Sequence, residues 1–176
     1  LRPGIDFSCD MAVPDLSVRL EVLPGDTVAE QIQNAADYGF EAIALPGRFK
    51  DAWLPGLRDC LPDSPLPIAS ISLGFVHSLL SPSPQQRGEC RDSLLRLMDL
   101  CAEFDAGLLN FPPCLIQDNP DRIGDAGDHA SVRERLDGLL LEQLAGIANE
   151  AMARAVTLLL EPVNKYESEY LNSVVH

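Results

Sequence analysis

The sequence predicts an α/β fold in which about five βα units form the first part of a parallel (β/α)₈ barrel. Short apolar runs alternate with longer segments of helical periodicity, and this alternation requires a parallel sheet because each helix returns the chain to the same end. The alternative is an open, doubly wound sheet. No Gly-x-Gly-x-x-Gly and no Gly-Lys-Ser/Thr motif follows an apolar run, so the sequence lacks the motifs that usually indicate a nucleotide-binding open sheet. The barrel is therefore favoured.

Each expected strand is a short apolar run bounded by Pro, Gly or polar residues. The first of them alternates apolar and polar side chains, which is typical of a strand with one buried face. The last is apolar throughout, which predicts a core strand buried on both faces. The expected strands are residues 16–22, 41–45, 67–75, 107–111 and 156–160, and residues 4–8 form either a further short strand or an extension.

Two helices are expected in the first half of the chain. Thr27 is followed three residues later by Glu30, which predicts a capping box at the start of the first helix, and Gly39 ends this helix. The second helix, over residues 51–60, is weaker because Pro55 interrupts it.

Two longer helices are expected in the second half. Pro82 and Pro84 punctuate a loop, and the most clearly amphipathic helix follows it, with Cys90 and Cys101 on the apolar stripe as small core residues. Residues 131–155 form the last helix. It follows the longest irregular segment, residues 116–130, a βα loop of the kind that often carries substrate contacts, and a further helix is expected to open over residues 170–176.

The length suits one domain over residues 1–176 that is cut at its carboxyl-terminal end. The 176 residues fall short of the roughly 250 that a complete barrel needs. The chain also starts without Met and stops inside an expected helix, so we expect both ends to be cut.

The charge and the apolar content exclude several classes of function. A net charge of −14 repels a phosphate backbone and argues against nucleic-acid binding. No segment reaches the roughly 18 apolar residues of a membrane span, and no signal peptide is evident, so we expect no membrane partner and a cytoplasmic location. Five scattered cysteines without a Cys-x-x-Cys pair indicate neither a disulfide framework nor a zinc site.

The chemistry is expected at Glu161, directly after the last expected strand. A carboxylate at the carboxyl end of a parallel strand points to the face where barrel enzymes hold their active sites. Residues 158–167, Leu-Leu-Leu-Glu-Pro-Val-Asn-Lys-Tyr-Glu, resemble the Glu-x-x-Asn-Arg-Tyr/Phe-Glu signature of the xylose-isomerase-like TIM barrels, particularly the ketose 3-epimerases and related sugar or sugar-phosphate isomerases. Residues 16–48, 91–113 and 159–173 resemble the corresponding βα units of the same barrels.

The resemblance implies roles for two carboxylates. Glu161 takes the position of a divalent-metal ligand and catalytic carboxylate, and Glu167 that of a substrate-binding carboxylate. Lys165 stands where the signature usually has Arg. Lysine lacks the planar guanidinium group of arginine, so a bidentate contact made by that Arg in relatives is in doubt. The resemblance also implies a Mn²⁺, Co²⁺ or Mg²⁺ ion that stabilises an enediolate, with an Asp, a His and a second Glu from later strands as its other ligands.

Other polar residues admit two interpretations each. His77 follows the third strand, so it either lines the pocket and binds substrate or is an ordinary loop histidine. Asn110 either binds substrate or satisfies a strand-end backbone group. Asp125, Asp128 and His129 cluster before the last helix, where capping is the favoured explanation, and Trp53 is interpreted as packing rather than sugar stacking.

The leading hypothesis is a metal-dependent sugar or sugar-phosphate isomerase or epimerase that binds a small carbohydrate and forms a homo-oligomer. An inositol-catabolism dehydratase or a hydroxypyruvate-type isomerase of the same superfamily is the alternative, together with a non-catalytic half-barrel. A DNA-repair endonuclease is disfavoured, because the chain has three His and a net charge of −14. One metal ligand is too few for a stable site, so we expect the 176 residues alone to be inactive.

Overall fold

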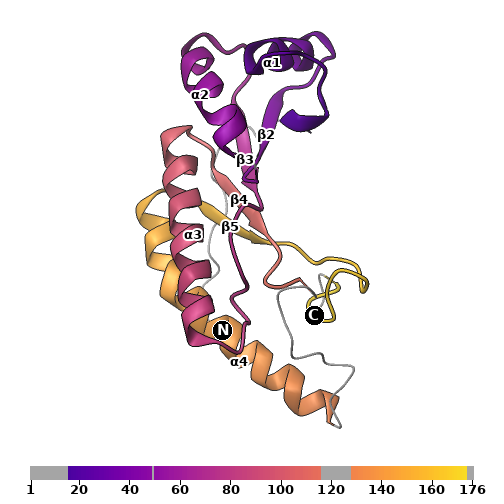
Figure 1. Cartoon of the computed structure of the whole chain (residues 1–176), viewed down its shortest axis with the longest axis vertical. Helices are drawn as coiled ribbons and strands as arrows, with labels where there is room; N and C mark the ends of the chain where they lie inside the picture. The colour runs from indigo at the N-terminus through magenta and orange to yellow at the C-terminus, as the bar shows by residue number, and fades with distance from the viewer. Residues whose placement is uncertain (1–15, 49, 116–127, 174–176) are drawn as a thin grey trace, which may run out of the picture.

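The computed structural model describes residues 16–48, 50–115 and 128–173 and arranges them as one parallel sheet with helices between successive strands (Figure 1). The strands lie in chain order, and every neighbouring pair is parallel. The expected alternation of strands and helices is therefore confirmed. The strands are β1 (Ser17–Arg19), β2 (Ala42–Pro46), β3 (Ile68–Ser72), β4 (Leu108–Phe111) and β5 (Thr157–Leu160); the helices are α1 (Val28–Asp37), α2 (Lys50–Cys60), α3 (Pro84–Glu103) and α4 (His129–Ala153), with short 3₁₀ helices η1 (Leu20–Val22) and η2 (Leu61–Asp63).

The sheet has one covered face and one open face. Helices α3 and α4 run side by side along one side of it (Figure 1). On the covered face, Ile71 of β3 stands beside Leu109 of β4, and both are fully buried. On the opposite face, Ser72, Asn110 and Leu159 stand beside one another on β3, β4 and β5, and each keeps some exposure to solvent. The core thus lies between the sheet and its helices.

Strand β1 is shorter than the alternating pattern of residues 16–22 predicts. The chain leaves the sheet after Arg19 and makes the single turn of η1, so the prediction of a strand is wrong over the last three residues. Leu20 is buried, whereas Val22 is 66% exposed. Within the described residues β1 pairs with β2 alone, so only one neighbour holds it extended, and the chain turns after three residues. Arg19 becomes the last residue of the strand.

Strand β5 is not buried on both faces, contrary to the expectation for residues 156–160. Thr157 is exposed and the Leu159 side chain is 39% exposed, whereas Leu158 and Leu160 pack partly against the core. Successive side chains of a strand point to opposite faces of the sheet, so Thr157 and Leu159 share the open face and are exposed to solvent.

The first helix begins as its capping box predicts. The Thr27 hydroxyl accepts a hydrogen bond from the Glu30 amide at 3.2 Å, and the Glu30 carboxylate accepts one from the Thr27 amide at 3.2 Å. Gly39 follows the helix with a φ of +85°. Helix α2, in contrast, continues through Pro55, which lies in the middle of the helix and removes a single backbone hydrogen bond.

Helix α3 begins earlier than the sequence indicates. Pro84 is its first residue rather than part of the preceding loop, since the first turn of a helix needs no amide donor. The Ser83 hydroxyl caps this end and accepts a hydrogen bond from the Gln86 amide. At the other end of the chain, residues 170–173 are not helical, so the expected opening of a helix is wrong there.

The core interpretations of the cysteines and of Trp53 are confirmed. Cys90 and Cys101 lie on the buried side of α3 and are fully buried, and burial raises the pKa of the Cys101 thiol to about 12. Trp53 is 6% exposed, donates a hydrogen bond from its indole nitrogen to the Pro46 carbonyl at 2.9 Å, and lies 6.5 Å from the ring of Phe104.

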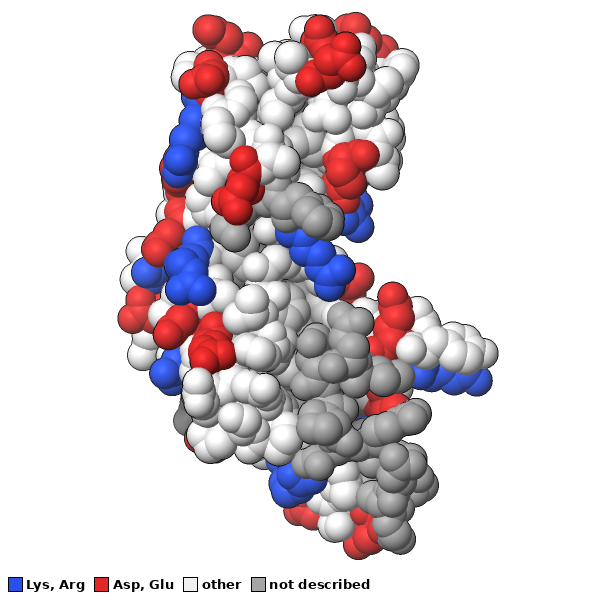
Figure 2. All heavy atoms as spheres, in the orientation of Figure 1, with Lys and Arg blue, Asp and Glu red and all other residues white. Residues whose placement is uncertain are grey.

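Some expectations fall outside the described residues. These are the possible strand over residues 4–8, Asp125 and most of the irregular segment before α4. Among the helices that the structure describes, none combines the length and the apolar character that crossing a membrane requires. Acidic side chains are spread over the face shown in Figure 2, with basic side chains among them and beside the hollow on the right of that view.

Candidate functional site

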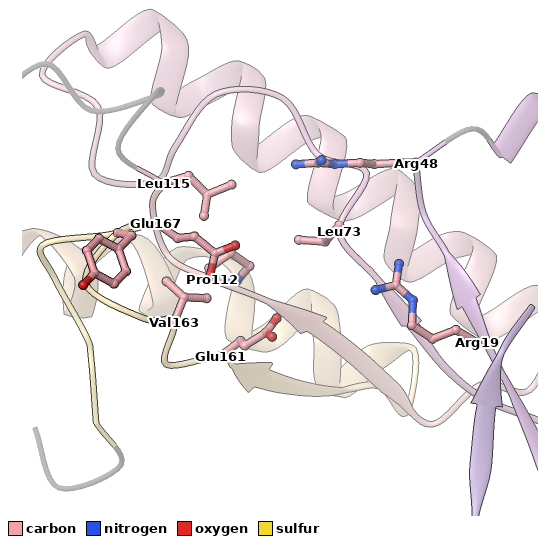
Figure 3. Close-up of a pocket in the computed structure, with 9 residues that line it drawn as sticks. Arg19, Arg48, Leu73, Pro112, Leu115, Glu161, Val163 and Glu167 are labelled. Atoms are coloured by element: carbon pink, nitrogen blue, oxygen red, sulfur yellow. The ribbon is translucent and has the colours of Figure 1, made fainter. Parts of the chain in front are cut away.

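A pocket of about 510 Å³ lies over the carboxyl ends of the strands, and every strand contributes to its wall (Figure 3). Arg19 is the last residue of β1, and Glu161 is the first residue after β5. Parallel strands all end at the same edge of a sheet, so one residue from each unit reaches a common space. The lining residues are Arg19, Arg48, Leu73, Pro112, Leu115, Glu161, Val163, Tyr166 and Glu167.

Two glycines bring the ends of β2 and β3 together. The Gly47 amide donates a hydrogen bond to the Ser72 carbonyl at 2.7 Å. At Gly74, where φ is +91°, a β-carbon would lie 2.2 Å from the carbonyl carbon of Gly47. Only two glycines permit this close approach of backbone to backbone. The crossing sets the direction in which the chain leaves β2 and carries Arg48 to the pocket.

The Glu161 carboxylate is held by the neighbouring strand. Its amide donates a hydrogen bond to the Phe111 carbonyl at 3.0 Å, which continues the pairing of β4 with β5. The Asn110 side chain donates to the Oε2 atom of Glu161 at 3.1 Å. Among the described residues, no hydrogen-bond donor reaches the Oε1 atom. The carboxylate therefore has a fixed orientation and one oxygen available to a ligand in the pocket.

The segment after Glu161 folds back and is anchored by a small buried network. The Ser168 hydroxyl donates to the Tyr170 carbonyl at 2.8 Å and lies 3.4 Å from the Cys114 sulfur atom. The Tyr170 hydroxyl donates to the Asp137 carboxylate of α4 at 2.6 Å. Burial, and then the hydrogen bond to this carboxylate, raise the pKa of Tyr170 well above its usual value. The network fixes the segment that carries Glu161 and Glu167.

We expect Tyr170→Phe to lower the free energy of unfolding by about 1–3 kcal/mol, because the partly buried Asp137 carboxylate loses the hydrogen bond from the phenol. The raised pKa means that the phenol stabilises the fold fully below pH about 10 and that this contribution is lost as the pH rises further. The variant should therefore lose less stability above pH 10 than the parent. Urea unfolding from pH 7 to 11 measures both effects. Tyr166→Phe is the control, since Tyr166 is 81% exposed, and an equal loss in both variants would contradict the prediction.

Glu167 lies in a tight turn at the pocket rim. The Asn164 side chain donates a short hydrogen bond to the Glu167 carboxylate and accepts one from the Tyr166 amide at 2.9 Å. The Glu167 amide in turn donates to the Asn164 carbonyl at 2.9 Å. Glu167 is exposed and belongs to the pocket lining, so its carboxylate is accessible to a bound molecule.

Sequence comparison assigns the chain to a family. The model of the family described as xylose isomerase-like TIM barrel matches residues 32–176. The chain belongs to this xylose isomerase-like TIM barrel family. The fold class and the resemblance that the sequence indicates are therefore confirmed, and the five-stranded sheet is the corresponding part of the barrel. A search of curated proteins gives no match.

Solved structures of this barrel type resemble the chain. A 3-keto-D-glucoside 4-epimerase from E. coli has a TM-score of 0.75 at 12% identity, covering 90% of this chain and 60% of that one. A D-psicose 3-epimerase from Clostridium cellulolyticum H10, solved with D-tagatose, has 0.67 at 17%, covering 89% and 55%. A xylose isomerase-like protein from Mycobacterium smegmatis, in complex with magnesium, has 0.56 at 18%, covering 87% and 56%. The chain thus spans little more than half the length of these barrels, and at such identities the likeness shows the fold.

The structure of this xylose isomerase-like chain separates the four predicted site residues into two groups. Glu161 and Glu167 line the pocket, and Asn110 lies behind Glu161 as its hydrogen-bond donor. His77 lies apart from the lining residues, with its Nε2 atom 2.8 Å from the Glu89 carboxylate. The capping interpretation of Asp128 is confirmed, since its carboxylate accepts hydrogen bonds from the first amides of α4.

The described side chains that line the pocket provide some, but not all, of the ligands that a divalent metal ion needs. The described residues contain no group of three or more His, Cys, Asp or Glu side chains that could hold a metal. Glu161 offers one oriented carboxylate oxygen, the hard ligand that Mg²⁺ and Mn²⁺ prefer. The described residues can therefore offer such an ion one coordination position.

The sequence pattern did not single out Arg19 and Arg48 as site residues. Both line the pocket opposite Glu161, from the ends of β1 and β2 (Figure 3). Their positions in the sequence indicate the role, because each is a basic residue at the end of a strand or within two residues of it. The chain has only 13 basic residues, so two of them at strand ends are notable. Arg19 is not recognisable as a strand-end residue from the sequence, because the alternating pattern predicts a strand that continues to residue 22.

Proposed function

We propose that the protein to which this chain belongs is a metal-dependent isomerase or epimerase of a sugar or sugar phosphate. The observation that carries the proposal is the position of Glu161, an oriented carboxylate in a pocket that all five strands build. The pocket is large enough for a small carbohydrate. Two of the resembling structures are named as sugar epimerases, and a third was solved with magnesium.

In this proposal the chain's own residues position the substrate and move a proton. The proton beside a sugar carbonyl is removed by a carboxylate, and its return to the opposite face or to the neighbouring carbon gives the epimer or the isomer. Glu161 is one carboxylate of that exchange, Asn110 holds it in place, and Glu167 donates no proton but accepts a hydrogen bond from a substrate hydroxyl. A bound Mn²⁺, Co²⁺ or Mg²⁺ ion would supply the positive charge that stabilises the enediolate.

The proposal concerns the complete protein, which we take to supply the other metal ligands and the second carboxylate. The 176 residues alone present one metal ligand in their described part, so we expect them to be inactive. The proposal also includes a homo-oligomer of the complete protein.

Exchange of the proton beside the carbonyl with deuterated water tests this function. Incubation of the complete protein with a panel of ketoses and Mn²⁺ should show loss of that proton signal by NMR and the growth of an epimer or aldose. Removing the ion with a chelator should stop both. The 176-residue chain should show neither. Absence of exchange from every ketose and aldose with each of the three ions would refute the proposal.

A further inference from the structure

The structure assigns an oxyanion subsite to Arg19 and Arg48, and we infer that the substrate carries a phosphate or carboxylate group. This inference rests on the proposed function for its choice of a sugar derivative. The subsite itself rests on the arrangement of charges. Figure 3 shows both guanidinium groups directed into the pocket on the side of β1 and β2, with Glu161 and Glu167 on the side of β5.

Arg48 is a cation with no acidic partner among the described residues. No ion pair or hydrogen bond of its guanidinium group occurs there, although the chain has twice as many acidic as basic residues, 27 against 13. The backbone crossing at Gly47 holds Arg48 at the pocket, so its place is built by the fold.

Arg19 adds a second cation at the same place. Its only ion pair in the described part of the chain is with Glu21, and both side chains are partly exposed. An exposed pair of this kind contributes little, so the guanidinium group can turn to a ligand at small cost. Two planar guanidinium groups make bidentate hydrogen bonds to the oxygens of a phosphate or carboxylate and bind it more firmly than lysines would.

The arginines do not serve to neutralise the pocket's own carboxylates. In the described residues, neither Arg19 nor Arg48 forms an ion pair with Glu161 or Glu167, although all four line one pocket. The pocket thus has a basic side and an acidic side with space between them. A sugar derivative with an anionic group at one end and a carbonyl and hydroxyl groups at the other matches both sides.

The test compares three six-carbon probes with different charge. Fructose 6-phosphate, gluconate and fructose are titrated into the protein by calorimetry, and binding is measured without reference to turnover. We expect at least one of the two anions to bind about tenfold or more tightly than fructose. Arg48→Gln should remove that advantage and leave fructose binding within about twofold. Arg91→Gln, an exposed arginine of α3 that is absent from the pocket lining, removes the same charge and should change nothing.

The relative affinity of the two anions identifies the group that the subsite binds. Tighter binding of fructose 6-phosphate indicates a phosphate, and tighter binding of gluconate indicates a carboxylate. Equal binding of all three probes, absence of binding by both anions, or an anion preference that survives Arg48→Gln would overturn the inference. Failure of the proposed function is a separate result: the anion preference would persist and be lost in Arg48→Gln, while no sugar exchanged its proton.

Discussion

Glu161→Gln is expected to lower kcat/KM of the complete protein at least about a thousandfold, because the amide neither takes up a proton nor balances the charge of a cation. The fold should be unaffected. Gln keeps the shape of Glu and can still accept the Asn110 hydrogen bond that orients the side chain. Steady-state kinetics measure the loss, and an unchanged unfolding midpoint shows that it is chemical rather than structural.

Glu167→Gln is the matched control, since it makes the same substitution in the same pocket. In the proposal Glu167 accepts a hydrogen bond from substrate, and a charged hydrogen bond contributes about 1.5–3 kcal/mol, so kcat/KM should fall between about tenfold and two-hundredfold. If the two variants lost activity equally, or if Glu161→Gln kept more than a tenth of it, Glu161 would not be the reacting carboxylate.

Gly74→Ala is expected to lower the free energy of unfolding by about 2–5 kcal/mol. A β-carbon at this position would approach three backbone atoms of Gly47 to between 2.2 and 2.7 Å, and backbone atoms cannot rotate away as a side chain can. The positive φ of +91° adds about 1–2 kcal/mol for any residue with a β-carbon. Urea unfolding measures the loss.

Gly88→Ala is the control for this substitution. Gly88 lies in α3, and a β-carbon there meets nothing within 4 Å, so alanine should stabilise the helix by up to about 1 kcal/mol. The two glycine variants should therefore shift the unfolding midpoint in opposite directions. A Gly74→Ala protein as stable as the parent would show that the crossing of the β2 and β3 ends is not as close as described.

The order of strands and helices could be predicted because each element carries a local signal. The capping box of Thr27 and Glu30 and the apolar stripe of α3 act over a few residues, and tertiary contacts do not alter them. The errors lie where tertiary contacts decide. The alternation of residues 16–22 continues past Arg19, where the chain leaves the sheet, and the apolar run of β5 gives no sign that one of its faces lies open.

The site was predictable only where a local sequence signal marks a residue. Glu161 follows an apolar run directly, so its place at a strand end was evident from the sequence. The hydrogen bond from Asn110 to Glu161 joins residues 51 positions apart and depends on the register of β4 with β5. Arg48 reaches the pocket through a contact between two loops. No spacing within the sequence encodes either relation.

Calorimetric titration of Mn²⁺ into the complete protein and its Glu161→Gln and Glu167→Gln variants tests most directly the claim that Glu161 is the metal-binding carboxylate of the pocket. We expect the parent and Glu167→Gln to bind the ion with nearly equal affinity and Glu161→Gln to bind it at least about a hundredfold more weakly, since the neutral amide loses both charge and basicity. Loss of the ion from Glu167→Gln with retention by Glu161→Gln would reverse the two assignments. Unchanged binding in both variants would place the metal site elsewhere.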